Sequence, residues 1–196
     1  MPPRIDVSRE TEACLDVYLA LLERWNARIN LIGPAPREAW RARHIEDSLQ
    51  LAGLLQGEGP LADLGSGAGL PGLVLAAATG RETHLVEADQ RKAAFLREAA
   101  REMGLAHVTI HATRIETAKL PPIATLTARA LAPLAALLSH TYNILAPGGI
   151  ALFPKGRNAD AELTEAAPHW HMAIERFSSR TDPQATIFRI RDLRPA

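Results

Sequence analysis

The chain has 196 residues, enough for one domain with a sizeable core but not for two full domains. Hydrophobic residues make up 47% and charged residues 22%, which is typical of globular proteins and excludes disordered and fibrous classes. Twenty-two basic residues balance twenty-two acidic ones, so the net charge gives no reason to expect a nonspecific nucleic-acid binder. Positions 24–44 contain five arginines and one acid, Glu38. This local excess of positive charge fits either an electropositive patch or a solvated helix face.

The amino-terminal residues lack the apolar stretch of a secretory signal, and no run of about 18 apolar residues suggests a membrane span. We therefore expect a cytoplasmic protein without membrane contact. The single cysteine, Cys14, cannot form an internal disulfide and lies in a helical apolar pattern. We expect it to be a buried structural thiol and not a reactive one.

Helical spacing dominates the first sixty residues. A first helix is predicted over 8–31, capped by Ser8, and a second over 37–55, before a glycine-rich segment. Residues 1–58 are thus predicted to form a helical segment that belongs to the same domain as residues 59–196.

After Pro60, short apolar strands alternate with amphipathic helices. The predicted strands are 61–64, 83–87, 107–111, 123–128 and 149–153, and the predicted helices are 71–79, 90–103 and 133–145. The tail adds a helix at 158–167 and two antiparallel strands at 169–177 and 185–191. This pattern predicts an α/β fold of the Rossmann-like class, with a seven-stranded, mostly parallel sheet covered on both faces.

A glycine-rich turn, DLGSGAGLPG over 63–72, connects the first strand to a helix. Glycines suit a turn whose backbone approaches a ligand closely. The dinucleotide fingerprint G-x-G-x-x-G is not met, because the third glycine falls one position early, at Gly69, and Leu70 follows it. The spacing of Asp63, Gly65, Gly67 and Gly69 instead resembles the first motif of class I methyltransferases.

A carboxylate, Glu87, ends the second strand, where it could accept hydrogen bonds from both hydroxyls of a ribose. Glu87 could also cap the following helix, although Asp89 fits that role better, and Asp63 could cap a nearby loop. The loop after the third strand would lie beside an adenine, and Glu116 within it could equally be a surface charge. Together these features favour S-adenosylmethionine over a nicotinamide cofactor.

Five segments together resemble one family, the bacterial small-subunit ribosomal RNA guanine-N7 methyltransferases, called RsmG and earlier GidB. They span most of the chain in the expected order, and the first two are far more specific than the glycine turn. The segments are 24–31 (RWNARINL), 43–49 (RHIEDSL), 63–72 (DLGSGAGLPG), 127–130 (TARA) and 153–156 (FPKG).

The resemblance implies S-adenosylmethionine as cofactor and N7 of a guanine in the decoding-region loop of 16S rRNA, the guanine 527 region, as target. The partner is then 16S rRNA or the small ribosomal subunit, and we expect a monomer. The chain is short for the family, and Glu87 stands where some relatives carry Asp. The implied cofactor contacts, with Glu87 as the acid after the second strand, are Gly65, Leu70, Ile115, Glu116 and Arg129.

The residues at hand limit the chemistry. Methylation at C5 of a pyrimidine needs a cysteine nucleophile, and Cys14 lies far from the strand ends. Enzymes acting on exocyclic amines usually carry an Asn- or Asp-Pro-Pro-aromatic run after the fourth strand, where this chain has Ala-Arg-Ala-Leu at 128–131. Guanine N7 presents a free lone pair and loses no proton, so no general base is required.

Arg129 is the main candidate for positioning substrate or cofactor, because a guanidinium can bind guanine O6, a phosphate or a carboxylate. The alternative is an internal ion pair with Glu87 or Asp47. Further candidates for the substrate side, each with a structural alternative, are Asn26, Asn30, His44, Asp47 and Lys155.

For these further candidates the alternatives are specific. Asn26 and Asn30 share a helix face and could tie the two amino-terminal helices together. His44 and Asp47 could form a hydrogen-bonded pair, and Lys155 could contact an RNA phosphate or be a solvated lysine. We expect no metal site. Two other functions stay open: a methyltransferase of this fold acting on a small molecule or protein, and a nucleotide-binding module without catalysis.

Overall fold

A seven-stranded sheet with the order β3-β2-β1-β4-β5-β7-β6 organises the protein. The structure is a computed structural model that describes residues 1–3 and 5–196. Neighbouring strands pair in parallel from β3 to β5, whereas β7 is antiparallel to both of its neighbours. The α/β fold and the mostly parallel sheet are therefore confirmed. The strands are β1 (Leu61–Leu64), β2 (Thr83–Val86), β3 (Val108–His111), β4 (Ile123–Thr127), β5 (Leu145–Lys155), β6 (Trp170–Ser178) and β7 (Thr186–Pro195).

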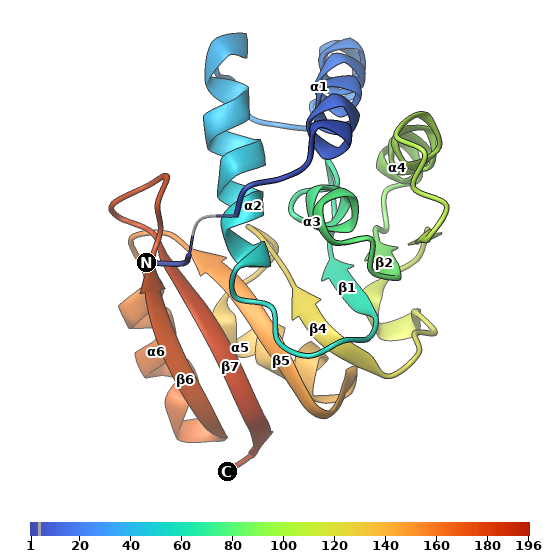
Figure 1. The fold of residues 1–196 in the computed structure, drawn as a ribbon. Coiled ribbons are helices and arrows are strands. Elements are labelled where there is room, and N and C mark those ends of the chain that lie inside the picture. Colours follow the sequence, from blue (N-terminus) through green and yellow to red (C-terminus); the bar gives the residue numbers. More distant parts are fainter. Residues whose placement is uncertain (4) are drawn as a thin grey trace.

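Helices cover both faces of this sheet (Figure 1). One apolar cluster joins α1, α3 and α4, and a separate cluster joins the inner strands to α5 and α6. The helices α4 and α1 start at predicted caps, since Asp89 accepts hydrogen bonds from the N–H groups of Arg91 and Lys92 and Ser8 accepts one from Thr11. The helices of the α/β part are α3 (Gly72–Thr79), α4 (Gln90–Glu102), α5 (Leu134–Tyr142) and α6 (Ala159–Ala166).

The second predicted helix is not a single regular helix. It consists of a 3₁₀ turn, η1 (Arg37–Ala39), a π-helical segment, η2 (Arg41–Glu46), and the α-helix α2 (Asp47–Ala52). The apolar periodicity of a sequence does not separate one helical hydrogen-bond pattern from another over so few turns, so the prediction missed the change. Short π-helical segments occur frequently at functional sites.

The amino-terminal helix α1 (Arg9–Ile29) packs into the same core as the α/β part. Tyr18 is fully buried, and its hydroxyl donates a 2.7 Å hydrogen bond to the carbonyl of Ala68 in the glycine turn. Trp25 lies edge-on against Phe95 with ring centroids 5.8 Å apart, so it contributes to the packing of α1 against α4. Helix α1 thus contacts the glycine turn through the hydrogen bond of Tyr18 and helps to fix the position of the turn.

Two further features of the sequence have their outcome in the fold. Cys14 is partly buried, its thiol donates to the carbonyl of Met103 at 3.3 Å, and burial raises its pKa, as expected for a structural thiol. Of the helices that the structure describes, none combines the length and apolar character needed to cross a bilayer.

Candidate functional site

The strand order reverses between β1 and β4, which lie side by side although two strands separate them in the chain. At such a switch point the loops leaving the two strands run to opposite faces of the sheet and open a crevice at the carboxyl ends. The turn after β1 carries the glycines, and Arg129 follows β4. The fold therefore brings the two main predicted parts of the site to one edge.

Three glycines give the turn after β1 its shape. Gly65, Gly67 and Gly69 have φ values of 62°, 54° and 80°, a region that other residues rarely adopt. At Gly65 a Cβ atom would also lie 2.4 Å from Cδ1 of Leu131, whereas at Gly67 the nearest atom would be 3.8 Å away. At Gly67 the positive φ, and not a crowding neighbour, is therefore what favours glycine.

Asp63 lies beneath this turn. Its side chain is fully buried, with Oδ2 accepting from the N–H of Gly72 at 3.2 Å and Oδ1 from the hydroxyl of Thr127 at 2.8 Å. Burial raises its pKa to about 6, against the lowering effect of these hydrogen bonds. The expectation that Asp63 contacts a cofactor directly is corrected: its oxygens hold the turn against β4.

Glu87 follows β2 and joins it to the turn. Its Oε2 accepts from the N–H of Gly67 and its Oε1 from the N–H of Asp89, both at 2.8 Å, and the residue is 8% exposed. A carboxylate oxygen accepts more than one hydrogen bond, so each oxygen keeps acceptor capacity. The carboxylate is therefore held in a fixed orientation beside the glycines.

The loop after β3 forms a short 3₁₀ turn, η3 (Ile115–Thr117). Ile115 packs against the cluster that contains α5, and Leu70 in the glycine turn is buried. The carboxylate of Glu116 is 62% exposed and lies 3.8 Å from Nε2 of His140. Ile115 thus offers apolar surface and Glu116 a solvent-facing carboxylate.

Arg129 forms the ion pair that the sequence left open as an alternative. Its Nη1 donates to Oδ2 of Asp47 at 3.0 Å, and the two side chains are 21% and 17% exposed. Among the described residues, its Nε and Nη2 donate to no protein group, so these donors remain available to a ligand. The next residue, Ala130, has a φ of 52°, a strained conformation that clusters at functional sites.

His44 and Asp47 do not form the hydrogen-bonded pair that their spacing suggested. The carboxylate of Asp47 is bound to Arg129, Thr181 and Gln50 instead. Both ring nitrogens of His44 are buried without a hydrogen-bond partner in the part of the chain that the structure describes. Burial, with the nearby Arg129 charge, lowers the pKa of His44 to about 4, so the ring is neutral at pH 7.

Lys155 is neither a solvated lysine nor free to contact a phosphate. Its ammonium group donates to the carbonyl of Ala132 at 2.8 Å and to Oε2 of Glu162 at 2.7 Å, and the side chain is 9% exposed. The same Glu162 oxygen accepts from the N–H of Leu134, at the start of α5. Lys155 therefore belongs to an internal ion pair, and its expected role toward RNA is corrected.

Asn26 and Asn30 shape the end of α1. Oδ1 of Asn26 accepts from the N–H of Ile32 at 2.9 Å, and Asn30 takes the left-handed conformation that ends the helix. The hydrogen bond of Asn26 and the backbone conformation of Asn30 are both local features, and they orient the chain as it leaves α1 toward η1.

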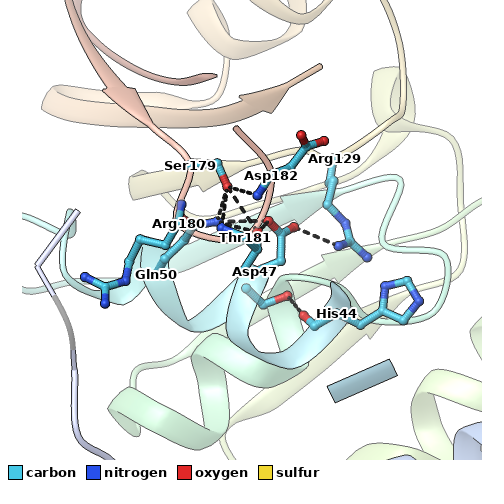
Figure 2. A network of polar contacts seen from close by, with 9 residues as sticks. His44, Asp47, Gln50, Arg129, Ser179, Arg180, Thr181 and Asp182 are labelled. Atoms are coloured by element: carbon cyan, nitrogen blue, oxygen red, sulfur yellow. Dashed lines mark hydrogen bonds and ion pairs between the residues drawn. The ribbon is translucent and has the colours of Figure 1, made fainter. Parts of the chain in front are cut away.

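Three polar residues at this site were not identified from the sequence: Gln50, Ser179 and Thr181. They surround Asp47, and the last two lie in the turn between β6 and β7, about 130 positions away along the chain (Figure 2). Spacing along a sequence carries no signal for contacts of this kind.

Comparison with known proteins identifies the family. The profile of the family described as rRNA small subunit methyltransferase G, or GidB, matches residues 11–183. The chain belongs to this family. A relative from Granulibacter bethesdensis named Ribosomal RNA small subunit methyltransferase G is 56% identical over 194 residues, which cover 98% of this chain and 91% of the relative. A relative of the same name from Rhodospirillum centenum is 52% identical, with 96% and 88% covered.

Solved structures support the fold. The N-methyltransferase NodS from Bradyrhizobium japonicum, in complex with S-adenosyl-L-homocysteine, superposes with a TM-score of 0.58 at 17% identity. The match covers 89% of this chain and 97% of that one. This chain thus shares its α/β fold with a solved methyltransferase.

Proposed function

We propose that the protein transfers a methyl group from S-adenosylmethionine to N7 of a guanine in 16S rRNA. The observation that carries the proposal is the glycine turn locked to Glu87 at the switch point of the sheet, in a chain matched over nearly its full length by rRNA small subunit methyltransferases G. The substrate is 16S rRNA or the small subunit that contains it.

The residues at the switch point suit a nucleoside without a pyrophosphate. The glycines of the turn let the backbone approach a ligand closely, and Glu87, fixed by two backbone N–H groups, suits a ribose. Ile115 offers apolar surface for an adenine. The residues that we propose to hold the cofactor are Gly65, Gly67, Gly69, Leu70, Glu87, Ile115, Glu116 and Arg129.

S-adenosylmethionine supplies an electrophilic methyl group on a sulfonium. When bound, it would offer this methyl group to the N7 lone pair; the carbon–sulfur electron pair would go to sulfur, and the positive charge to the purine. No proton leaves guanine. The task of the protein is therefore to hold the two reactants in line, which can supply about 7 to 11 kcal/mol of barrier reduction.

The side chains near the crevice are consistent with a reaction that needs no base. His44 is neutral at pH 7. The reaction does not need this histidine as a general base, because no proton is removed from guanine. Arg129, with donors to spare, can bind the methionine carboxylate, guanine O6 or a phosphate. We propose the cofactor carboxylate as its partner, because the family resemblance implies a cofactor contact at this position.

Two other functions would use the same crevice: methylation of a small molecule or protein, and binding of a nucleotide without catalysis. The naming of the relatives favours rRNA over both. We further propose that the protein acts as a monomer in the cytoplasm, where ribosomal subunits are assembled.

A transfer assay tests the proposal. The protein is incubated with radiolabelled S-adenosylmethionine and either intact small subunits or bare 16S rRNA, and the labelled base is then mapped. We expect label on N7 of one guanine. Absence of transfer to both RNAs, with binding of the cofactor retained, would leave only the alternatives.

A further inference from the structure

Asp47 is the centre of a polar network that joins three distant parts of the chain (Figure 2). Its Oδ2 accepts from Nη1 of Arg129 at 3.0 Å, just after β4. Its Oδ1 accepts from the hydroxyl of Thr181 at 2.7 Å and from Nε2 of Gln50 at 2.9 Å. Oδ2 of Asp47 thus binds the residue after β4, and Oδ1 binds the turn that connects β6 to β7.

That turn is itself locked onto α2. Gln50 and Ser179 are 4% and 6% exposed, and Nε2 of Gln50 donates to Oγ of Ser179 at 3.1 Å. The amide oxygen of Gln50 accepts from the N–H of Arg180 at 2.9 Å. The hydroxyl of Ser179 also accepts from the N–H groups of Thr181 and Asp182, so the turn has a single well-defined shape.

We infer that Asp47 is a positioning residue for Arg129, and that the turn at 179–182 sets its orientation through Thr181 and Gln50. The inference rests on the proposed function, in which Arg129 binds the cofactor. A free arginine side chain has many rotamers, and this freedom is lost when a ligand fixes the guanidinium. Thr181 and Gln50 hold Oδ1 of Asp47, and Oδ2 of the same carboxylate binds Nη1 of Arg129. This contact restricts the arginine side chain before a ligand binds and leaves its other guanidinium donors available.

The competing interpretation is that the network only ties α2 to the carboxyl-terminal hairpin. In that case its loss would lower stability but would not act through Arg129. The two interpretations differ in whether the effects of Thr181 and Arg129 on cofactor binding are independent, which a double-mutant cycle measures.

The experiment measures the dissociation constant of S-adenosylmethionine by calorimetry for the full chain. Thr181→Val removes the hydroxyl while keeping the shape, Thr181→Ser restores it, and Asp47→Asn removes the charge. Thr164→Val, on the exposed side of α6, is the matched control, since among the described residues its hydroxyl bonds only the carbonyl of Asp160. The melting temperature of each variant is recorded in parallel.

We expect Thr181→Val and Asp47→Asn to raise the dissociation constant about fivefold or more, equivalent to losing one hydrogen bond. Thr181→Ser and Thr164→Val should stay within about twofold of wild type. In an Arg129→Ala background, Thr181→Val should have no further effect. If Thr181→Val does not fold, Asp47→Asn completes the same cycle.

The inference would be overturned by wild-type affinity in both Thr181→Val and Asp47→Asn, or by the same fold-loss with and without Arg129. An unchanged dissociation constant in Arg129→Ala alone would also overturn it, because Arg129 would then not bind the cofactor. The proposed function fails separately, when the wild-type protein binds no S-adenosylmethionine or transfers no methyl group to RNA.

Discussion

Oε2 of Glu87 accepts the backbone N–H of Gly67 at 2.8 Å, so the end of β2 and the turn after β1 form one unit. Glu87 cannot move without disturbing the turn, and the turn cannot open without breaking a charge-assisted hydrogen bond. The residue proposed to bind the ribose therefore also sets the backbone that lies beside the cofactor.

We expect Glu87→Ala to raise the dissociation constant of S-adenosylmethionine by about 10- to 100-fold, because a hydrogen bond to a charged group contributes about 1.5 to 3 kcal/mol. Calorimetry measures the change. Glu165→Ala, at an exposed position on α6, serves as the control and should bind like wild type. An unchanged constant in Glu87→Ala would show that the ribose is held elsewhere.

We expect Arg129→Ala to abolish methyl transfer and to lower the melting temperature without unfolding the protein, since Asp47 loses its cation but keeps Thr181 and Gln50 as partners. Arg129→Lys should restore little activity, because an ammonium group lacks the planar set of donors of a guanidinium. The radiolabel assay measures both variants. Wild-type turnover in Arg129→Ala would remove this residue from the site.

The ion pair of Lys155 predicts a loss of stability and not of RNA affinity. Lys155→Met leaves Glu162 partly buried without its cation, and should lower the free energy of unfolding by about 2 kcal/mol. Urea denaturation measures this loss, with the exposed Lys119→Met as control. The opposite pattern, unchanged stability with weaker RNA binding and a smaller salt dependence, would restore a phosphate contact for Lys155.

Asp63 predicts a pH dependence of stability. Burial raises its pKa to about 6, above the value of an unfolded aspartate, so the folded chain retains a proton that the unfolded chain has released between about pH 4 and pH 6. Its contribution to stability is therefore greatest below pH 4 and decreases as the pH rises through this window, by roughly 3 kcal/mol at most.

Asp63→Asn removes this titration. The free energy of unfolding of wild type minus that of the variant should therefore fall between pH 4 and pH 7, as measured by urea denaturation at several pH values. A difference that stays constant over this range would mean that Asp63 titrates alike in both states.

Much of the architecture is a local property of the sequence. Apolar runs of four or five residues between turn-forming residues predict strands, helical spacing predicts helices, and Asp89 marks a helix start by its own short side chain. The glycine turn was also predictable, because positive φ values at Gly65, Gly67 and Gly69 are favourable only without a side chain. These signals depend on neighbouring residues alone.

The partners of the charged side chains were decided only by the tertiary structure. The sequence left Lys155 either to contact an RNA phosphate or to be solvated, yet the fold places Oε2 of Glu162 2.7 Å from its ammonium group and leaves the lysine side chain 9% exposed. Arg129 lies 82 positions after Asp47, and Thr181, which completes the network around Asp47, lies 134 positions after Asp47. A charge interacts with whatever the fold brings near, and nearness across a sheet depends on the whole topology and not on residue type or spacing.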